Sequence, residues 1–315
     1  MAELYPTIEP HASGHLDVGD GHLLYWETTG NPSGRPAVWL HGGPGSGSGT
    51  GIRRCFDPMA YRLVVFDQRG CGRSRPLADG PHADLTTNTT SHLLADLETL
   101  RDHLGIDRWV VAGASWGVTL ALAYAQRFPH RVEALALMSV TAGRRMETDW
   151  ITRSMRRIFP REWDAFTAVV PEGERDGDLA AAYGRMLADP DPQINERAAL
   201  AWCEWEDVHV SLAPGWTPAL RYEDPTFRQV FARLVTHYWS NGCFLDASPI
   251  LHNMACIAHI PGVLIHGRYD VSGPLDTAWD LHRLWPASRL VVVDDAGHGG
   301  VSMTAALIDA LDDLR

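Results

Sequence analysis

A Gly-x-Ser-x-Gly run, Gly113-Ala-Ser-Trp-Gly117, is the segment of this chain that could carry a nucleophile. Residues 108–112 before it are short, apolar and β-branched, which predicts a buried strand. Residues 118–127 after it have a helical pattern that stops before Pro129. On such a sharp turn a serine hydroxyl is exposed, and glycine on both sides lets the backbone pack closely. A purely structural glycine-rich turn is the alternative, but the strand–turn–helix context favours Ser115 as a nucleophile.

A serine hydroxyl needs a base to take its proton, and two residues further along the chain have suitable chemistry. Asp270 comes just after an apolar stretch at 262–266, and His298 comes just after another at 289–293. Both would therefore stand at strand ends, like Ser115. We expect His298 to act as general base and then as acid toward the leaving group, while Asp270 fixes its tautomer and stabilises the imidazolium.

Other residues compete for these roles. Asp276, Asp294 and Asp295 are alternative acids, but the last two are too near His298 in sequence to approach its ring easily from behind. Most of the 15 histidines must be structural or exposed. His298 differs from them because it lies in a glycine-flanked loop after a terminal strand, which favours the catalytic interpretation.

An acyl-transfer site also needs two backbone N–H groups to hold the developing oxyanion. We expect one from Trp116, the residue after the nucleophile, and one from the loop His41-Gly-Gly-Pro-Gly45. Gly43 is the favoured donor of that loop, with Gly42 as its competitor. A nucleotide site is disfavoured because no Gly-x-Gly-x-x-Gly fits in residues 41–51. Neither His-Glu-x-x-His nor clustered His and Cys spacing suggests a metal, so we expect no cofactor.

Apolar strands alternate with helices around these residues. A helix with a leucine stripe is expected at 91–104, and a hairpin turns at Asp20-Gly21 within 15–28. Such alternation implies a mostly parallel sheet with helices on both faces. The expected parallel strands are 36–40, 62–66, 108–112, 133–138, 262–266 and 289–293.

The alternation breaks between about residues 143 and 250, where the chain becomes helical and rich in tryptophan. We therefore expect an α/β-hydrolase core made of residues 1–142 and 251–315. Residues 143–250 would form an inserted helical cap, or lid, over the carboxyl ends of the strands, where sites of α/β proteins lie.

Composition narrows the function further. A net charge of −12 argues against a nucleic-acid partner, and the chain of 315 residues has no apolar run long enough for a membrane span. The first ten residues lack the features of a secretory signal. Five widely spaced cysteines without a C-x-x-C pair indicate idle thiols in a cytoplasmic protein. All 27 basic residues are arginine, which excludes a Schiff-base or phosphate-loop lysine.

At this point the chain resembles the proline iminopeptidases, a family of the α/β-hydrolase fold. The resemblance extends over residues 20 to 300 and implies cleavage of an N-terminal residue, typically proline, through an acyl-enzyme and without a cofactor. The matching segments are His41-Gly-Gly-Pro-Gly45, Phe66-Asp-Gln-Arg-Gly-Cys-Gly-Arg-Ser74, Gly113-Ala-Ser-Trp-Gly117, Trp202-Cys-Glu-Trp-Glu206, Gly267-Arg-Tyr-Asp270 and Ala296-Gly-His298.

The resemblance also implies that Glu206, in the lid, binds the free amino group of the substrate. An aminopeptidase needs an anion at the end of its cleft, which pairs with the ammonium and blocks longer chains. Glu204 is the competitor for this role, and a solvated helix face is the alternative for both residues.

Three positions depart from the family pattern. Val235 aligns with a glutamate that is a second amine ligand in the family, and Ala142 and Thr152 align with aromatic residues of its proline pocket. These replacements predict a roomier pocket and weaker amine capture. Loss of two aromatic walls would reduce specificity for a small ring by roughly tenfold to a hundredfold.

The sequence thus predicts a cytoplasmic serine aminopeptidase that releases proline or another small residue from a peptide or peptide-like amide. One alternative is removal of an aminoacyl group from a small non-peptide amine in natural-product biosynthesis, and another is ester or lactone hydrolysis. Ser115 argues against epoxide hydrolases and dehalogenases of this fold, which need aspartate there. A non-catalytic binding protein is the alternative from a different class. The sequence makes no prediction of the oligomeric state.

Overall fold

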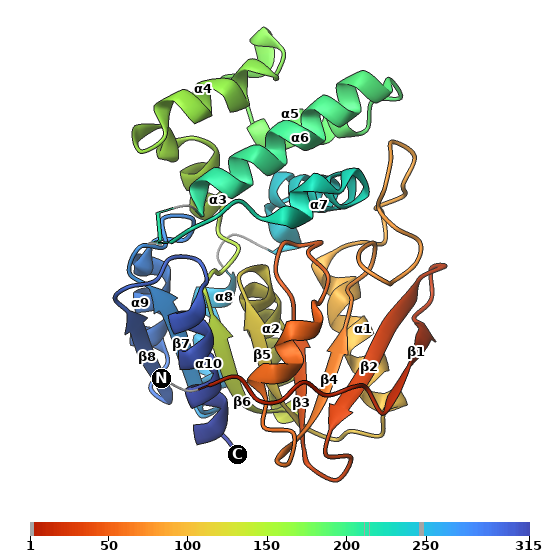
Figure 1. The fold of residues 1–315 in the computed structure, drawn as a ribbon, viewed down its shortest axis with the longest axis vertical. Coiled ribbons are helices and arrows are strands. Elements are labelled where there is room, and N and C mark those ends of the chain that lie inside the picture. Colours follow the sequence, from red (N-terminus) through yellow and green to blue (C-terminus); the bar gives the residue numbers. More distant parts are fainter. Residues whose placement is uncertain (1–2, 211, 214, 246–248) are drawn as a thin grey trace.

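The computed structural model describes residues 3–210, 212–213, 215–245 and 249–315, and its centre is one eight-stranded sheet. The strand order is β1-β2-β4-β3-β5-β6-β7-β8 (Figure 1). β1 and β2 are antiparallel to their neighbours, and the remaining strands pair in parallel. The strands are β1 Ala12–Asp17, β2 Leu23–Gly30, β3 Arg35–Leu40, β4 Tyr61–Phe66, β5 Trp109–Ala114, β6 Val132–Met138, β7 Gly262–Gly267 and β8 Ser288–Val293.

The expected strands are confirmed, with ends that differ by one or two residues. The parallel strands are mostly apolar because helices cover both faces of the sheet, and their charged residues, such as Arg35, Arg62 and Glu133, lie near the strand beginnings. The amino-terminal hairpin turns where Gly19, Asp20 and Gly21 all have positive φ, a geometry that glycine and aspartate tolerate better than other residues.

Two apolar cores separate the sheet from its helices. One contains side chains of α1, α2, α8 and α9, and the other contains those of α10 and of the 3-10 helix η1, Thr50–Cys55. The helices of these layers are α1 Thr90–His103, α2 Trp116–Arg127, α8 Pro249–His252, α9 Leu275–Leu284 and α10 Val301–Asp313. Together these layers form the α/β-hydrolase fold.

The segment between β6 and β7 is mostly helical and lies over the carboxyl edge of the sheet (Figure 1). It has an apolar cluster of its own, which includes Phe166, Tyr183, Trp202 and Trp205. Its helices are α3 Arg145–Thr152, α4 Pro160–Ala168, α5 Leu179–Leu187, α6 Pro192–His209 and α7 Pro225–Ser240, with the 3-10 helix η5 at Leu220–Glu223. Side chains of α3, α6 and α7 therefore face the ends of the strands.

Within the described residues, every helix is too short or too polar to span a lipid bilayer.

Candidate active site

Ser115 occupies the sharp turn between β5 and α2. Its backbone has φ 56° and ψ −124°, a strained geometry that places the side chain at the carboxyl edge of the sheet. Only glycine fits at the two flanking positions, because a Cβ atom at either one would clash with neighbouring backbone. A Cβ on Gly113 would lie 2.7 Å from the carbonyl oxygen of Gly117, and one on Gly117 would lie 2.0 Å from that of Leu40. The turn thus packs directly against the end of β3.

Asp270 and His298 lie together beside this turn, each in the loop after its strand. His298 Nδ1 is 2.9 Å from Oδ2 and 3.1 Å from Oδ1 of Asp270, whose side chain is fully buried. Burial alone would raise the pKa of Asp270, but the charge and hydrogen bond of His298 hold it below its usual range. Burial alone would lower the pKa of His298, but Asp270 raises it. This arrangement stabilises the imidazolium that forms when His298 takes up a proton.

The competing acids have other partners. Asp294 is 3.0 Å from the Arg268 guanidinium, and Asp295 accepts a hydrogen bond from Ser302. Asp276 accepts from the N–H of Thr277 at the start of α9. Of the four carboxylates considered, Asp270 is therefore the one beside the His298 ring.

Ser115 and His298 line the same cavity, together with Gly43 and Trp116. In the described residues no hydrogen bond joins the Ser115 hydroxyl to the His298 ring. Such contacts often tighten only when a substrate is bound. Gly43 has φ 111°, and a Cβ there would lie 2.5 Å from the Gly45 nitrogen, so only glycine fits. Gly42, its competitor, packs against the Ser115 Cβ but is not part of this cavity wall.

Gln68 connects the two segments expected to hold the oxyanion, a role that the sequence did not suggest. Its amide Nε2 donates to the carbonyl of His41, and its Oε1 accepts from the Trp116 indole at 2.9 Å. Its backbone N–H also donates to His41 Nε2. The Asp-Gln-Arg-Gly motif therefore fixes the loop at 41–45 relative to the nucleophile turn.

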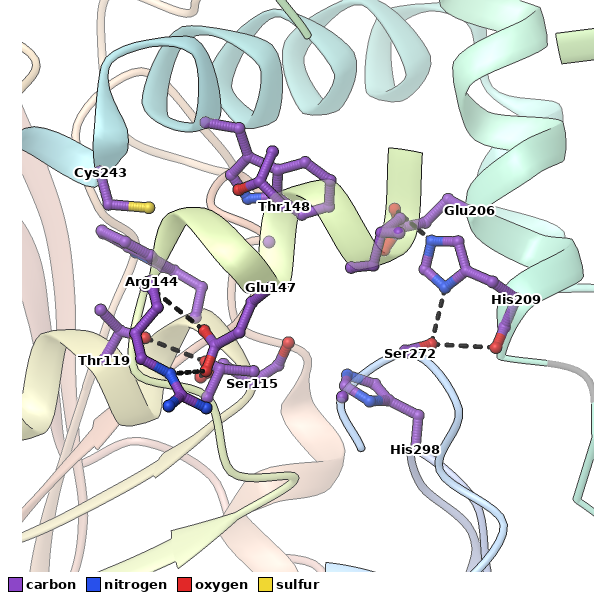
Figure 2. Close-up of a pocket in the computed structure, with 17 residues that line it drawn as sticks. Ser115, Thr119, Arg144, Glu147, Thr148, Glu206, His209, Cys243, Ser272 and His298 are labelled. Carbon is purple, nitrogen blue, oxygen red and sulfur yellow. Dashed lines mark hydrogen bonds and ion pairs between the residues drawn. The ribbon is translucent and has the colours of Figure 1, made fainter. Parts of the chain in front are cut away.

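The cavity next to Ser115 has a volume of about 60 Å³, and side chains of α3 and α6 in the helical segment line it (Figure 2). Glu206, on the last turn of α6, lines it. Glu204 is exposed and is absent from this lining, so the alternative amine-binding assignment does not fit the structure. The reason is helical phase, because two residues on a helix lie about 200° apart around its axis.

His209 and Ser272 accompany Glu206, and sequence reasoning missed both. His209 Nε2 lies 3.1 Å from Glu206 Oε2, and its Nδ1 lies 2.6 Å from the Ser272 hydroxyl (Figure 2). Burial would raise the pKa of Glu206, but His209, and then His298, lower it. Glu206 is therefore an ionised carboxylate. The spacing of Glu206 and His209 on one helix face was the available signal, but nothing in the sequence pointed to Ser272.

A second carboxylate, Glu147 on α3, also lines the cavity, but its charge is already compensated. It accepts from the guanidinium and backbone N–H of Arg144 and from the N–H of Ala142. The hydroxyl of Thr277 donates to it as well, at 2.8 Å. Glu147 is thus a structural anchor that holds the start of α3 against α9.

Ala142 and Thr152, the positions that align with aromatic residues of the family's pocket, do not line the cavity of this chain. Both are buried outside the cavity, whereas Thr141 and Ile151 line it. Ser139, just after β6, has φ 57°. The Thr141 hydroxyl donates to the carbonyl of Ser115 at 3.0 Å, which holds Thr141 beside the nucleophile turn. On α3 the helical phase favours Ile151 and Thr148 over Thr152, whose hydroxyl donates to the Thr148 carbonyl.

Val235 lies on α7 and is buried in the apolar cluster of the helical segment. The residue of α7 that lines the cavity is Trp239. Position 235, where the family has a glutamate, carries no carboxylate in this chain. Of the two carboxylates that line the cavity, Glu147 is paired with the Arg144 guanidinium, whereas the described residues place no guanidinium in an ion pair with Glu206.

Two larger cavities open on the other side of His298, with volumes of about 530 and 640 Å³. Arg221 lines both of them. The walls of the first include the apolar side chains Leu4, Trp39, Ile52, Phe231 and Leu307, and those of the second include Trp216. The small cavity and the first larger cavity share Gly43, Ser115, Glu206 and His298 in their walls, so the two spaces meet at the nucleophile.

Comparison with known proteins shows which family of proteins this chain is similar to. Residues 36–301 match the model of the alpha/beta hydrolase fold. A probable proline iminopeptidase of Streptomyces coelicolor is 51% identical over 98% of this chain and 97% of its own length. Proline iminopeptidases of Xylella fastidiosa (47% identity, 95% of this chain, 94% of theirs) and Arabidopsis thaliana (46%, 94% and 77%) are also similar.

Solved structures share the fold at lower identity. Proline iminopeptidase of Mycobacterium smegmatis superposes with a TM-score of 0.66 at 20% identity, covering 96% of this chain and 98% of the other. The structure of VinJ superposes with a TM-score of 0.67 at 22% identity, covering 98% and 100%. These two similarities establish the arrangement of the elements.

Proposed function

This chain belongs to the proline iminopeptidase family of the α/β-hydrolase fold, and we propose that it is a serine aminopeptidase acting on peptides or peptide-like amides. It releases one N-terminal residue, proline or another small residue. The proposal assigns catalysis to Ser115, Asp270 and His298. The identity of 51% with a probable proline iminopeptidase over nearly the whole chain supports it.

In this mechanism the Ser115 hydroxyl attacks the carbonyl carbon of the first residue while His298 takes its proton. The backbone N–H groups of Gly43 and Trp116 stabilise the oxyanion. His298 then gives the proton to the leaving nitrogen, and the acyl-enzyme remains on Ser115. A water molecule, activated by the same imidazole, releases the amino acid. Asp270 stabilises the imidazolium in both halves of the reaction.

One observation supports an aminopeptidase rather than a general acyl hydrolase. Glu206 is an ionised carboxylate that lines the same small, closed cavity as Ser115. An N-terminal ammonium bound there pairs with the carboxylate, whereas a longer chain or an acylated amine leaves the carboxylate without a cationic partner. Glu206 therefore favours a substrate whose first residue carries a free amino group.

The cavity walls support a small first residue. They include four short or aliphatic side chains, Thr119, Thr141, Thr148 and Ile151, beside the larger side chains of Trp116, Trp239, Arg144 and Glu147. A volume of about 60 Å³ admits a few non-hydrogen atoms such as those of a proline ring or an alanine methyl group. Such walls discriminate weakly between small apolar groups.

The larger cavities support a bulky leaving group. The apolar wall of the first cavity fits a hydrophobic second residue, or the body of a small non-peptide amine. Removal of an aminoacyl group from such an amine is accordingly the second candidate function. Ester hydrolysis uses the same machinery but makes no use of Glu206.

We also propose that residues 143–250 act as one cap over a core of residues 1–142 and 251–315, and that the enzyme works in the cytoplasm. The separate apolar cluster of the helical segment supports the first point. All five cysteines are free thiols, four of them buried, which supports a reducing compartment.

A panel of aminoacyl-β-naphthylamides, each with a free and an N-acetylated amine, tests the proposal. An aminopeptidase hydrolyses the free forms of the proline and alanine substrates and rejects the acetylated forms. Equal rates on both forms would instead establish an esterase-like acyl hydrolase.

A further inference from the structure

We propose that Arg221 is a specificity-determining residue that binds a carboxylate on the leaving group, so that the preferred substrates are short peptides with a negative charge on their second residue. The α-carboxylate of a dipeptide and the side chain of an acidic second residue are the two sources of that charge. This inference rests on the proposed function, because it concerns the leaving group of the same reaction. It adds a cationic subsite to the anionic one that receives the amine.

Arg221 belongs to the wall of a cavity that also contains the reacting groups. It lies on η5, and it lines the first larger cavity, whose walls include Ser115, Glu206 and His298 as well. The volume of about 530 Å³ is in the range of pockets that bind small molecules. A leaving group attached to the carbonyl that Ser115 attacks can therefore enter a space with a guanidinium in its wall.

Arg221 is also the cation of that cavity that can bind an anion. Among the described residues that line it, Arg221 is the one arginine, and the chain has no lysine. His41, another lining residue, is neutral, because its Nε2 accepts from the backbone N–H of Gln68 and its Nδ1 donates to the carbonyl of Gly42. His298 is paired with Asp270.

The Arg221 guanidinium makes no ion pair in the part of the chain that the structure describes. Its Nη2 donates to the neutral Tyr222 hydroxyl at 3.0 Å. Asp207 and Asp295 line the second larger cavity with Arg221, but they accept from the N–H of Ala219 and from the Ser302 hydroxyl. Most of the N–H donors of Arg221 are thus free for an anionic ligand.

Aromatic rings hold the guanidinium in place. Its Cζ lies 4.9 Å from the ring centroid of Tyr222, 5.5 Å from that of Phe227 and 5.7 Å from that of Phe231. Phe231 is itself part of the cavity wall. Rings attract the face of a guanidinium and leave its N–H edges for acceptors in the plane. A carboxylate matches that edge with two parallel hydrogen bonds.

The separation of the charges fits the two ends of a dipeptide. The Arg221 charge lowers the pKa of Glu206 and that of His298, so it acts on both groups. Arg221 and Glu206 nevertheless form no ion pair within the described residues. An extended dipeptide spans at most about 7 Å, with an ammonium at one end and a carboxylate at the other. Opposite charges that are near each other without contact can bind both ends at once.

The overall charge of the protein makes this subsite easy to detect. A net charge of −12 repels anionic substrates at long range. An uncharged leaving group would therefore be favoured if no local cation took part. A preference for a carboxylate over the matching amide consequently reports a specific contact.

Two matched pairs of peptides test the inference in the parent enzyme. One pair is alanyl-phenylalanine and its C-terminal amide, and the other is the α-amides of alanyl-glutamate and alanyl-glutamine. We expect kcat/KM to be about tenfold higher for the carboxylate in at least one pair. An advantage in the first pair assigns the α-carboxylate, and one in the second pair assigns the acidic side chain. Equal values within both pairs would overturn the inference.

Substitutions identify the cation. Arg221→Met removes the charge and should bring the carboxylate-to-amide ratio of kcat/KM close to unity. Arg221→Lys keeps a charge without the planar fork, so its ratio should be intermediate. Arg197→Met, an exposed arginine of α6, changes the net charge equally and should leave the ratio as in the parent enzyme. A tenfold preference that persists in Arg221→Met would contradict the assignment.

Salt provides a test that needs no variant, should Arg221→Met not fold. Arg221 is exposed, so its pair with a carboxylate is screened by ions. In the parent enzyme the ratio should fall as sodium chloride rises from about 0.05 to about 0.5 M. A carboxylate preference that does not respond to salt would exclude an ion pair at this exposed wall.

The outcomes separate the two proposals. If the enzyme hydrolyses free aminoacyl naphthylamides but uses carboxylates and amides equally well, this inference is wrong and the aminopeptidase activity stands. If it hydrolyses neither the naphthylamides nor any of the four peptides, the proposed function itself is wrong.

Discussion

His266 Nε2 lies 3.8 Å from Asp270 Oδ2, yet His266 is no second cation for that carboxylate. Its Nδ1 accepts from the N–H of Val140 at 3.1 Å, and its Nε2–H donates to the carbonyl of Gly273 at 2.6 Å. Both ring nitrogens are thus assigned to a neutral imidazole, and burial lowers the pKa of His266. The full charge of Asp270 therefore acts on His298.

Replacement of Asp270 by asparagine should lower kcat by about 10⁴, because His298 would then be held in the wrong tautomer. Steady-state kinetics on an aminoacyl naphthylamide measure this loss. Asp276→Asn is the matched control, since that carboxylate only accepts from Thr277 N–H at the start of α9. A larger loss in the control would exclude Asp270 as the third member.

Replacement of Ser115 by alanine should reduce kcat on the order of 10⁶ without unfolding the protein. The strained turn tolerates alanine no worse than serine, so the circular dichroism spectrum should be unchanged. A fluorophosphonate probe should label the parent enzyme and not the variant. Residual activity above a few per cent in clean protein would refute Ser115 as the nucleophile.

Replacement of Glu206 by glutamine should cost about 2–5 kcal/mol in transition-state binding of aminoacyl substrates, because the ammonium loses a desolvated charge partner. Simple acyl esters carry no amine and should be nearly unaffected. The ratio of kcat/KM on the two substrate types measures the difference. Glu204→Gln, on the exposed face of the same helix, should change neither value, and parallel losses on amides and esters would indicate a structural role for Glu206.

The pH profile follows from the pKa direction of His298. The base must be neutral to take the Ser115 proton, so kcat/KM rises as pH passes the pKa of His298 in the free enzyme. Asp270 raises that pKa above the ordinary value of 6.5. The rise of kcat/KM with pH should therefore have its midpoint above pH 6.5. Removal of the charge in Asp270→Asn should shift this limb to lower pH. A limb that stays in place in the variant would contradict the assignment.

Proline and alanine substrates should differ by no more than about tenfold in kcat/KM. Threonine and isoleucine side chains make few specific contacts with a pyrrolidine ring, so the pocket binds it only slightly more strongly than a methyl group. An extended apolar leaving group should raise kcat/KM for both, since it fits the larger cavity. Matched prolyl and alanyl amides of a small arylamine and of a long apolar amine measure both effects. A preference for proline above a thousandfold, independent of the leaving group, would refute this account of the pocket.

Local patterns predicted much of the fold because the central strands β3, β4, β5, β6 and β7 are mostly buried and several turns have a characteristic residue chemistry. The turn at Ser115 and the loops that carry Asp270 and His298 could be placed for the same reason. All three follow directly from strands whose direction is fixed by parallel pairing, so their side chains meet at one edge.

The features of the site that local patterns could not predict depend on which face each helix or loop turns toward the cavity, and on contacts between segments that are distant in the sequence. That Thr141 and Ile151 line the cavity, and Ala142 and Thr152 do not, depends on the course of the backbone after β6, where Ser139 has a left-handed conformation that no periodicity reveals. The pair of His209 and Ser272 joins residues 63 positions apart, one on a helix end and one in a loop after β7. Such a contact depends on how the helical segment sits over the sheet, which sequence patterns do not specify.

The close approach of Gly117 to the carbonyl of Leu40 has a consequence for directed evolution. Between α2 and the end of β3 there is no room for even one methyl group on residue 117, because its carbon would lie 2.0 Å from the carbonyl oxygen of Leu40. The nucleophile turn and the 41–45 loop therefore cannot be diversified independently. Libraries that place any side chain at 117 should lose activity whatever sequence accompanies it. New substrate ranges should arise instead from Thr148 and Ile151 on α3, whose side chains line the cavity and lie outside that junction.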